Sequence, residues 1–268
     1  MVKQFYFVIL SFILSFYGNL GVVFSEIREI KSMRQIEREV NRETLLVFDL
    51  DNTLIEPIQS LGSDQWYYYL VRKYKEMDKM SEEKAYQKAD EVWNKTQWLV
   101  EVESVEKTTP QFIQKLQRKG IKMMGLTART FDISDVTMKQ LKSVGIEFKK
   151  AVYPKNLEFK LVDTAHYVQG IMYIGEQNDK GKVLVQFLKS IHYQPKKIVF
   201  VDDKQKHVTS MERALAELKI KYIGFRYGAA DERVQRFNHD VEDMELFCHG
   251  TWTHEADEKF KKFSQEHR

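Results

Sequence analysis

Short apolar runs recur along the chain, and this pattern constrains its fold more than any other feature. A run without polar interruption is typical of a strand that is buried on both faces of a parallel sheet. The recurring runs therefore predict several such strands in one sheet. They are Leu45 to Phe48, Lys122 to Leu126, Ile198 to Val201 and, with a more mixed composition, Tyr222 to Phe225.

Segments with a helical pattern lie between and after these runs. Strands that alternate with helices predict a doubly wound α/β fold, in which helices cover both faces of a parallel sheet. A chain of 268 residues with 43% hydrophobic content can bury a real core, so we expect one such domain with an appended subdomain. The expected helices are Thr109 to Arg118, Asp132 to Val144, Lys182 to Ile191 and Val208 to Leu218.

A long stretch without Pro or Gly interrupts this alternation after the first strand. Gln65 to Val105 is rich in aromatic residues, Lys and Glu, and its apolar positions lie near helical spacing. We therefore predict a helical insertion at about residues 56–106. The residues at helical spacing are Trp66, Leu70, Tyr74 and Met77.

Two further segments carry weaker patterns. Alternation and a glycine in the sequence YVQGIMYIG, within Ala151 to Gln177, predict a short hairpin. Glu26 to Glu43 is highly charged and is expected to form a helix that packs one narrow face on the core. The apolar residues of that face are Ile27, Ile30, Met33 and Ile36.

The C-terminal tail from Asp231 onward also has a helical pattern. We expect its apolar residues to share one side of the helix, and these are Val234, Phe237, Val241 and Met244.

The first residues have the pattern of a secretory signal peptide. Lys3 precedes the apolar run from Phe5 to Tyr17, and small residues follow in the sequence GNLGVVFS. Cleavage after Ser25 would leave residues 26–268 as the mature chain, exported to the periplasm or secreted. The alternative is an uncleaved membrane anchor over residues 5–24, which are almost enough to span a bilayer.

The charge balance argues against nucleic acid as a partner. The chain has 42 Lys and Arg against 39 Asp and Glu, a formal net charge of +3, and loss of Lys3 with the leader would leave +2. Cys248 is the single cysteine, which excludes an intramolecular disulfide and every metal site built from several cysteines.

Two carboxylates stand directly after the first buried strand, in the sequence DLDNT. The carboxyl ends of strands are where ligands bind in open α/β sheets, so Asp49 and Asp51 would project into a crevice. Asp49 could attack phosphorus as a nucleophile and form an aspartyl-phosphate. Asp51 could protonate the leaving oxygen and later activate water. The alternative is an ordinary Asp-Asn turn at the end of a strand.

Polar residues also follow the next two buried runs. Thr127, in the sequence LTART, could hold a phosphoryl oxygen with its hydroxyl and neighbouring N–H groups, or could act only as a cap or turn residue. Asp202 and Asp203 form a carboxylate pair suited to Mg²⁺, which prefers oxygen ligands. These carboxylates would repel a phosphate, so a cationic side chain is needed as well.

Two lysines in the sequence NDKGKVLVQFL are candidates for that cation. Lys180 begins a predicted helix and is the first candidate, with Lys182 as the fallback. Arg129 could bind substrate or could pair with a carboxylate. His207, His239, His249 and His254 fit no compact ligand spacing, so we expect them in surface or capping roles.

With these motifs in order, the chain from about Thr44 to Tyr227 resembles the haloacid dehalogenase (HAD) superfamily. DLDNT is similar to its first motif, Thr127 to the second, Lys180 to the third, and Asp202 with Asp203 to the fourth. The second Asp of DLDNT resembles the phosphatase and phosphotransferase branches, and the insertion has the position of a C1-type cap. The whole chain also resembles a bacterial family of uncharacterised HAD-type proteins.

The resemblance implies a Mg²⁺-dependent phosphomonoester hydrolase that acts on a small phosphorylated substrate. By the same resemblance, Mg²⁺ would be held by the Asp49 carboxylate, the Asp51 main-chain carbonyl and Asp203, with Asp202 as a direct or water-mediated ligand. Two alternatives remain open at this point. One is phosphotransfer to another alcohol, as in a phosphomutase, and the other is an exported binding protein that keeps the fold without turnover.

Overall fold

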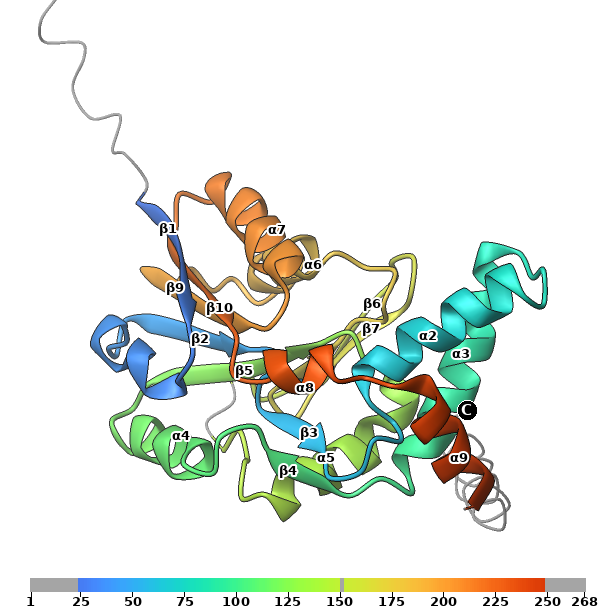
Figure 1. Cartoon of the computed structure of the whole chain (residues 1–268). Coiled ribbons are helices and arrows are strands. Elements are labelled where there is room, and N and C mark those ends of the chain that lie inside the picture. The colour runs from blue at the N-terminus through green and yellow to red at the C-terminus, as the bar shows by residue number, and fades with distance from the viewer. Residues whose placement is uncertain (1–23, 150–151, 249–268) are drawn as a thin grey trace, which may run out of the picture.

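The computed structural model describes residues 24–149 and 152–248, and its centre is one mixed sheet. The strand order is β1-β10-β9-β2-β5-β8-β7-β6 (Figure 1). The first six strands are parallel, β7 is antiparallel to β8, and β6 is antiparallel to β7. The expected doubly wound α/β fold is thereby confirmed. The strands are β1 (Ser25–Ile30), β2 (Thr44–Phe48), β5 (Lys122–Thr127), β6 (Leu157–Phe159), β7 (Ala165–Val168), β8 (Ile171–Tyr173), β9 (Lys197–Asp202) and β10 (Lys221–Tyr227).

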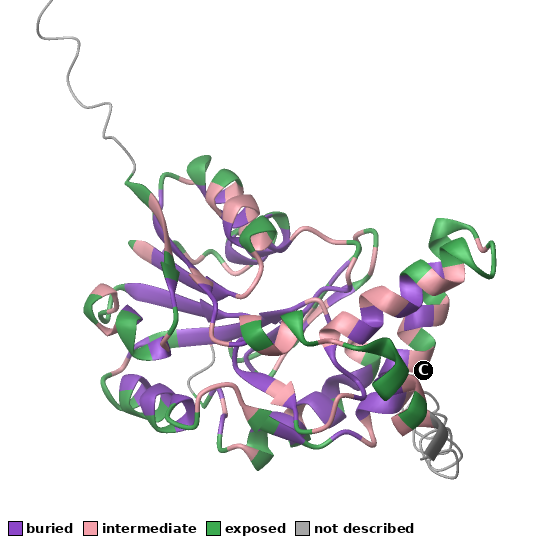
Figure 2. Ribbon diagram, in the orientation of Figure 1, coloured by how far each residue is buried: buried purple, intermediate pink, exposed green. Residues whose placement is uncertain are grey.

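Helices cover both faces of this sheet, as Figure 1 shows, and β2 and β9 lie between them with almost every residue buried (Figure 2). On one face α4 (Thr109–Arg118) and α5 (Ser134–Ser143) pack, and on the other α6 (Lys180–Ser190) and α7 (Gln205–Ala216). Each face has its own apolar cluster. All four expected helices and all four expected strands are present, with boundaries that differ by at most three residues.

The expected helix over Glu26 to Glu43 was wrong. Its first part is β1, an edge strand parallel to β10, and only Met33–Glu39 is helical, as a 3-10 helix (η1). Residues three apart on a strand face opposite sides of the sheet. Ile27 and Ile30 accordingly pack in the apolar clusters on opposite faces of the sheet. The spacing of three residues, which predicted one face of a helix, therefore places these two side chains on two faces of a strand.

The expected hairpin is present as β7 and β8. Val168 pairs with Ile171, which leaves a two-residue turn of Gln169 and Gly170, both with positive φ (50° and 86°). This is the backbone that a tight hairpin turn requires, and glycine adopts it without strain. The hairpin extends the sheet beyond β5, because β8 pairs parallel with β5 and β7 pairs antiparallel with β8.

The helical insertion forms a separate layer beside the carboxyl ends of the strands (Figure 1). It consists of α2 (Asp64–Glu76) and α3 (Glu82–Gln97), and a two-stranded ribbon of β3 (Ile55–Pro57) and β4 (Val102–Ser104) joins it to the core. Ser63 and Ser81 cap the two helices by accepting backbone N–H groups. Trp66 is fully buried within the insertion, which we call the cap.

The C-terminal segment is helical as expected, but its buried face differs from the prediction. A break after α8 (Asp231–Gln235) resets the helical phase before α9 (His239–Cys248), so Val241 and Met244 are exposed. Glu242 is buried instead and accepts a hydrogen bond from Ser63 Oγ at 2.6 Å, which ties α9 to the start of α2.

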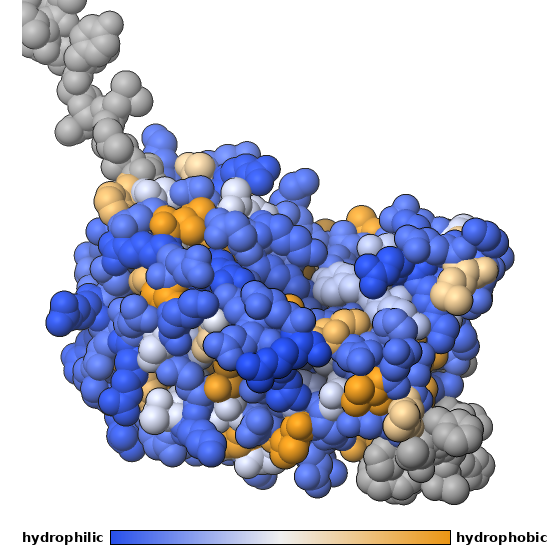
Figure 3. Space-filling model, in the orientation of Figure 1, coloured by the Kyte–Doolittle hydropathy of each residue, from blue (hydrophilic) through white to orange (hydrophobic). Residues whose placement is uncertain are grey.

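The outer surface is mainly hydrophilic, with apolar residues scattered over the face drawn in Figure 3. Within the described residues, no helix is long and apolar enough to cross a membrane. The predicted signal peptide lies almost wholly in residues 1–23, outside the described part of the chain.

Burial of Glu242 predicts a pH-dependent stability. Burial raises its pKa to about 8, well above the ordinary 4.5. Between these values the folded protein binds more protons at this site than the unfolded chain, so the free energy of unfolding falls as pH rises. We expect Glu242→Gln to be more stable than the wild type by about 1 to 3 kcal/mol at pH 9, with little difference at pH 4.

Urea unfolding at both pH values measures this difference, and Glu232→Gln is the matched control because that carboxylate is exposed on α8. A Glu242→Gln difference that is the same at both pH values would contradict the assignment.

Candidate active site

The register of the sheet brings the predicted site residues to one edge. Phe48 of β2 pairs with Val201 of β9, so Asp49 and Asp202 leave neighbouring strands at the same level. Thr127 ends β5 on the other side of β2. The pairing continues into the site, because the Asp49 N–H donates to the Val201 carbonyl at 2.9 Å.

Lys180 lies between two of the carboxylates. Its Nζ is 2.7 Å from Asp49 Oδ1 and 2.7 Å from Asp202 Oδ2, and its side chain is only 2% exposed. The next residue, Gly181, allows this approach, since a Cβ there would lie 2.8 Å from the Ser210 carbonyl and from Ala214 on α7. The start of α6 therefore packs directly on α7 and places Lys180 over the strand ends.

Charge and burial act against each other in this cluster. Burial would lower the pKa of Lys180, but Asp202 and Asp49 outweigh it and hold the pKa above its ordinary value. Asp202 keeps a pKa below its ordinary range because Lys180 and His207 outweigh its burial. Burial and the negative charge of Asp202 raise the pKa of Asp49 to about 7. Lys180 thus neutralises the charge of only one carboxylate in a group of several that lie together at this site.

Asp203 belongs to that group of carboxylates, and no described Lys, Arg or His forms an ion pair with its side chain, although the charge of Lys204 acts on it. Its N–H donates to Thr53 Oγ1 at 3.1 Å, and Asn52 Nδ2 donates to its Oδ2 at 3.4 Å. Its Oδ1 is buried without any partner among the described residues. Burial, Asp202 and Asp49 raise the pKa of Asp203 well above its ordinary value. A buried carboxylate oxygen without a partner, next to the negative charges of Asp202 and Asp49, is a suitable ligand for a hard dication, which prefers oxygen ligands.

A second set of potential ligand atoms, from Asp49, Asp202 and His207, lies within 4.8 Å of one another. The Lys180 ammonium already bonds both carboxylates of that set, so it fills the position that a metal would take there. The Asp203 side of the cluster therefore suits a cation better. His207 itself does not have the expected surface role, because its Nδ1 lies 3.1 Å from Asp202 Oδ2.

Arg129 pairs with Asp51, the second of the two roles considered for it. Its Nε and Nη2 donate to the two carboxylate oxygens of Asp51 at 2.9 and 2.7 Å. Nη1 donates to Thr137 and Gln140 on α5, so the buried guanidinium is fixed on both sides. Thr127 is fully buried, and its hydroxyl accepts the Arg129 N–H at 3.1 Å.

The cap contacts the site through residues that the sequence did not single out. Lys204 Nζ bonds Asp64 on α2 at 2.8 Å and the Tyr68 hydroxyl at 2.9 Å. The same hydroxyl donates to Glu176, before α6, at 2.6 Å. Lys204 directly follows Asp203 after the end of β9, so its position in the sequence could have identified it as a residue of the site. No local pattern could have identified Asp64 and Tyr68 as its partners.

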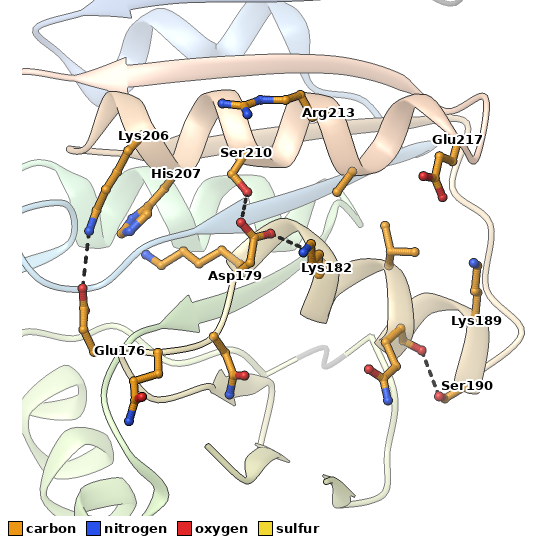
Figure 4. Close-up of a pocket in the computed structure, with 16 residues that line it drawn as sticks. Glu176, Asp179, Lys182, Lys189, Ser190, Lys206, His207, Ser210, Arg213 and Glu217 are labelled. Atoms are coloured by element: carbon orange, nitrogen blue, oxygen red, sulfur yellow. Dashed lines mark hydrogen bonds and ion pairs between the residues drawn. The ribbon is translucent and has the colours of Figure 1, made fainter. Parts of the chain in front are cut away.

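Lys182, the fallback for the active-site lysine, forms no ion pair with Asp49 or Asp202 in the described part of the chain. It lines a groove of about 910 Å³ between α6 and α7, to which Lys180 and His207 also contribute (Figure 4). Its N–H is capped by the Asp179 side chain at 2.8 Å. Lys180, rather than Lys182, is therefore the lysine that meets the carboxylates. His249 and His254 lie outside the described residues, and His239 stacks on Tyr69 with 4.5 Å between ring centroids.

Comparison with solved structures finds similar chains at low identity. One is a phosphoserine phosphatase with an analogue of its phospho-aspartyl intermediate, 14% identical, with a TM-score of 0.36, covering 72% of this chain and 98% of that one. Another is the class C acid phosphatase of Bacillus anthracis, 18% identical, with a TM-score of 0.35, covering 76% of this chain and 81% of that one.

Sequence relatives include proteins of Chlamydia and Rickettsia. A Chlamydia trachomatis protein named "Putative outer membrane protein" is 24% identical over 204 residues, which are 75% of this chain and 76% of that protein. The family model described as "Protein of unknown function (DUF2608)" matches residues 26–251. This agrees with the resemblance of the motifs to an uncharacterised bacterial family. The chain belongs to the DUF2608 family.

Proposed function

We propose that the protein is a Mg²⁺-dependent phosphomonoester hydrolase that acts through an aspartyl-phosphate on Asp49. The observation that carries the proposal is the buried contact of Lys180 with both Asp49 and Asp202, beside an orphaned oxygen of Asp203. A protein that only bound a partner would have no need to bury three carboxylates around one lysine, because each buried charge has a desolvation cost.

In the first step, an Asp49 carboxylate oxygen attacks phosphorus and the bond from phosphorus to the ester oxygen breaks. Asp51 gives its proton to the departing alkoxide, which leaves as an alcohol. In the second step, water attacks the aspartyl-phosphate, and Asp51 takes the water proton. The phosphate leaves, and Asp49 returns as a carboxylate.

Lys180 and Thr127 hold the transferring group in this scheme. Lys180 would offset the negative charge of the phosphoryl oxygens and keep Asp49 oriented. The Thr127 hydroxyl accepts the Arg129 N–H, so its own hydrogen can be donated to a phosphoryl oxygen.

Mg²⁺ would be held by Asp49, the Asp51 carbonyl and Asp203, with Asp202 close by. When bound, it would offset the charge of the phosphoryl oxygens and favour the ionised form of Asp49.

The cap must open in each cycle under this proposal. Both carboxylate oxygens of Asp51 accept hydrogen bonds from Arg129 in the closed arrangement, so the carboxylate is held against Arg129 and would not turn toward a substrate. Substrate entry would separate the cap residues Asp64 and Tyr68 from Lys204. Arg129 can then turn toward a phosphoryl oxygen, the other role considered for it.

We further propose that the protein acts outside the cytoplasm. The apolar leader at residues 1–25 supports export, and relatives carry the name of outer membrane proteins. Hydrolysis in the periplasm or beyond the cell fits a small phosphorylated substrate better than a nucleic acid, given the balanced charge.

Replacing the nucleophile tests the mechanism directly. We expect Asp49→Asn to release phosphate from an aryl phosphate about a thousandfold more slowly than the wild type, because the amide cannot form the aspartyl-phosphate. Asp240→Asn, which changes an exposed carboxylate on α9, is the control and should keep full activity. Undiminished turnover by a folded Asp49→Asn variant would exclude Asp49 as the nucleophile.

Mg²⁺ binding can be measured without turnover. At about 100 times its dissociation constant, Mg²⁺ should raise the melting temperature of the wild type by roughly 5 to 10 °C. Asp203→Asn should lose most of this shift, because the orphaned oxygen is then an amide oxygen without charge. Equal shifts in the two proteins, at matched ionic strength, would place the metal elsewhere.

A further inference from the structure

A narrow cavity separates the cap from the strand ends. Its volume is about 30 Å³, room for about two water molecules. Asp51 and Arg129 form part of its wall on the core side, and Tyr67, Asp90 and Trp93 form part of it on the cap side. A leaving group attached to a phosphate at Asp49 would occupy this space, so its walls determine which leaving groups fit.

Carboxylates dominate the lining of this cavity. Asp51, Asp64, Asp90 and Glu176 all contribute to it, against Arg129 as the single cation among the lining residues described. Three of the four have cationic partners, since Arg129 bonds Asp51, Lys204 bonds Asp64 and Lys206 lies 3.4 Å from Glu176.

Asp90 is the exception. Its Oδ1 accepts a hydrogen bond from the Tyr67 hydroxyl at 2.9 Å, and no Lys, Arg or His among the described residues forms an ion pair with it. The charged groups that act on it are the carboxylates of Asp163, Glu176 and Asp132. Burial and these charges raise the pKa of Asp90 to about 6, so it is ionised at neutral pH without a counter-charge.

Two aromatic rings line the same cavity as this carboxylate. Tyr67 and Trp93 meet edge to face, with 6.1 Å between ring centroids and an interplanar angle of 81°. The Trp93 ring already attracts one cation, because the Arg129 guanidinium carbon lies 5.3 Å from its centroid. A carboxylate among aromatic rings is the environment that binds an organic ammonium group, through an ion pair and through cation–π attraction.

We propose that the substrate is a short phosphate monoester whose leaving group carries a primary ammonium, and that Asp90 binds this ammonium. The inference rests on the proposed phosphatase function and adds the class of substrate to it. Asp90 is then a specificity-determining residue supplied by the cap, while the reacting atoms lie at the strand ends.

The cavity also limits the substrate in two other ways. The small volume of the cavity favours a short leaving group over a sugar or a nucleoside. A carboxylate on the leaving group would meet the negative charges of Asp90 and Glu176, so amino acid phosphates should be poorer substrates than simple aminoalkyl phosphates.

The test compares two isosteric esters, 2-aminoethyl phosphate and n-propyl phosphate, which differ by an ammonium in place of a methyl group. We expect kcat/KM of the wild type to be at least tenfold higher for the aminoethyl ester. Asp90→Asn keeps the acceptor for the Tyr67 hydroxyl but removes the charge. It should lower kcat/KM for the aminoethyl ester about 10- to 50-fold and leave the propyl ester within about twofold.

Glu91→Gln is the matched control, because it removes a carboxylate from the same helix outside the cavity. It should change neither ester. Equal wild-type rates for the two esters, or an equal loss on both in a folded Asp90→Asn variant, would overturn the ammonium site while leaving the phosphatase intact. Failure to hydrolyse both these esters and an aryl phosphate would overturn the proposed function, and the substrate inference with it.

Discussion

The Lys180 ammonium, held at 2.7 Å from both Asp49 and Asp202, is the contact on which the rest of the site depends. It joins the start of α6 to the ends of β2 and β9, and so links one helical layer to the sheet at the point where charge is concentrated. Removing it would leave buried carboxylates facing one another, which is far more costly than losing an exposed ion pair. The same contact explains why Gly181 must be small, since α6 has to approach α7 closely to deliver the lysine.

The strand-end side of the candidate site could be predicted from sequence because the register of the sheet places the residues that follow each strand. Asp49, Thr127 and Asp202 each follow an apolar run, and parallel pairing fixes their relative level. The failed predictions share a different cause. β1 was taken for a helix because its pairing with β10 spans the whole chain, and the buried face of α9 was misplaced because a break before it shifted the helical phase. Pairing between strands that are distant in sequence and breaks between helices cannot be recognised from the periodicity of apolar residues.

The cap was predicted as a helical insertion, but its contacts with the core were not. Asp64, Tyr68 and Asp90 are ordinary surface residues when read from a helical pattern, and only the folded arrangement turns them toward Lys204, Glu176 and the cavity. Specificity in such an arrangement depends on residues from two layers that are far apart in sequence. The residues of the candidate chemistry can therefore be proposed from one sequence, whereas a proposal for the leaving group needs the cavity.

The cap and Asp51 are physically coupled through Arg129. Gln97 near the end of α3 faces Gln140, with its Oε1 3.2 Å from Gln140 Nε2, and Gln140 in turn accepts from Arg129. Trp93 on the same helix lies against the guanidinium. A movement of α3 away from the core would remove two of the groups that hold Arg129 against Asp51. Under the proposed function, cap opening would thus loosen the contacts that hold Arg129 against Asp51. Asp51 could then turn toward a leaving group only when substrate has entered.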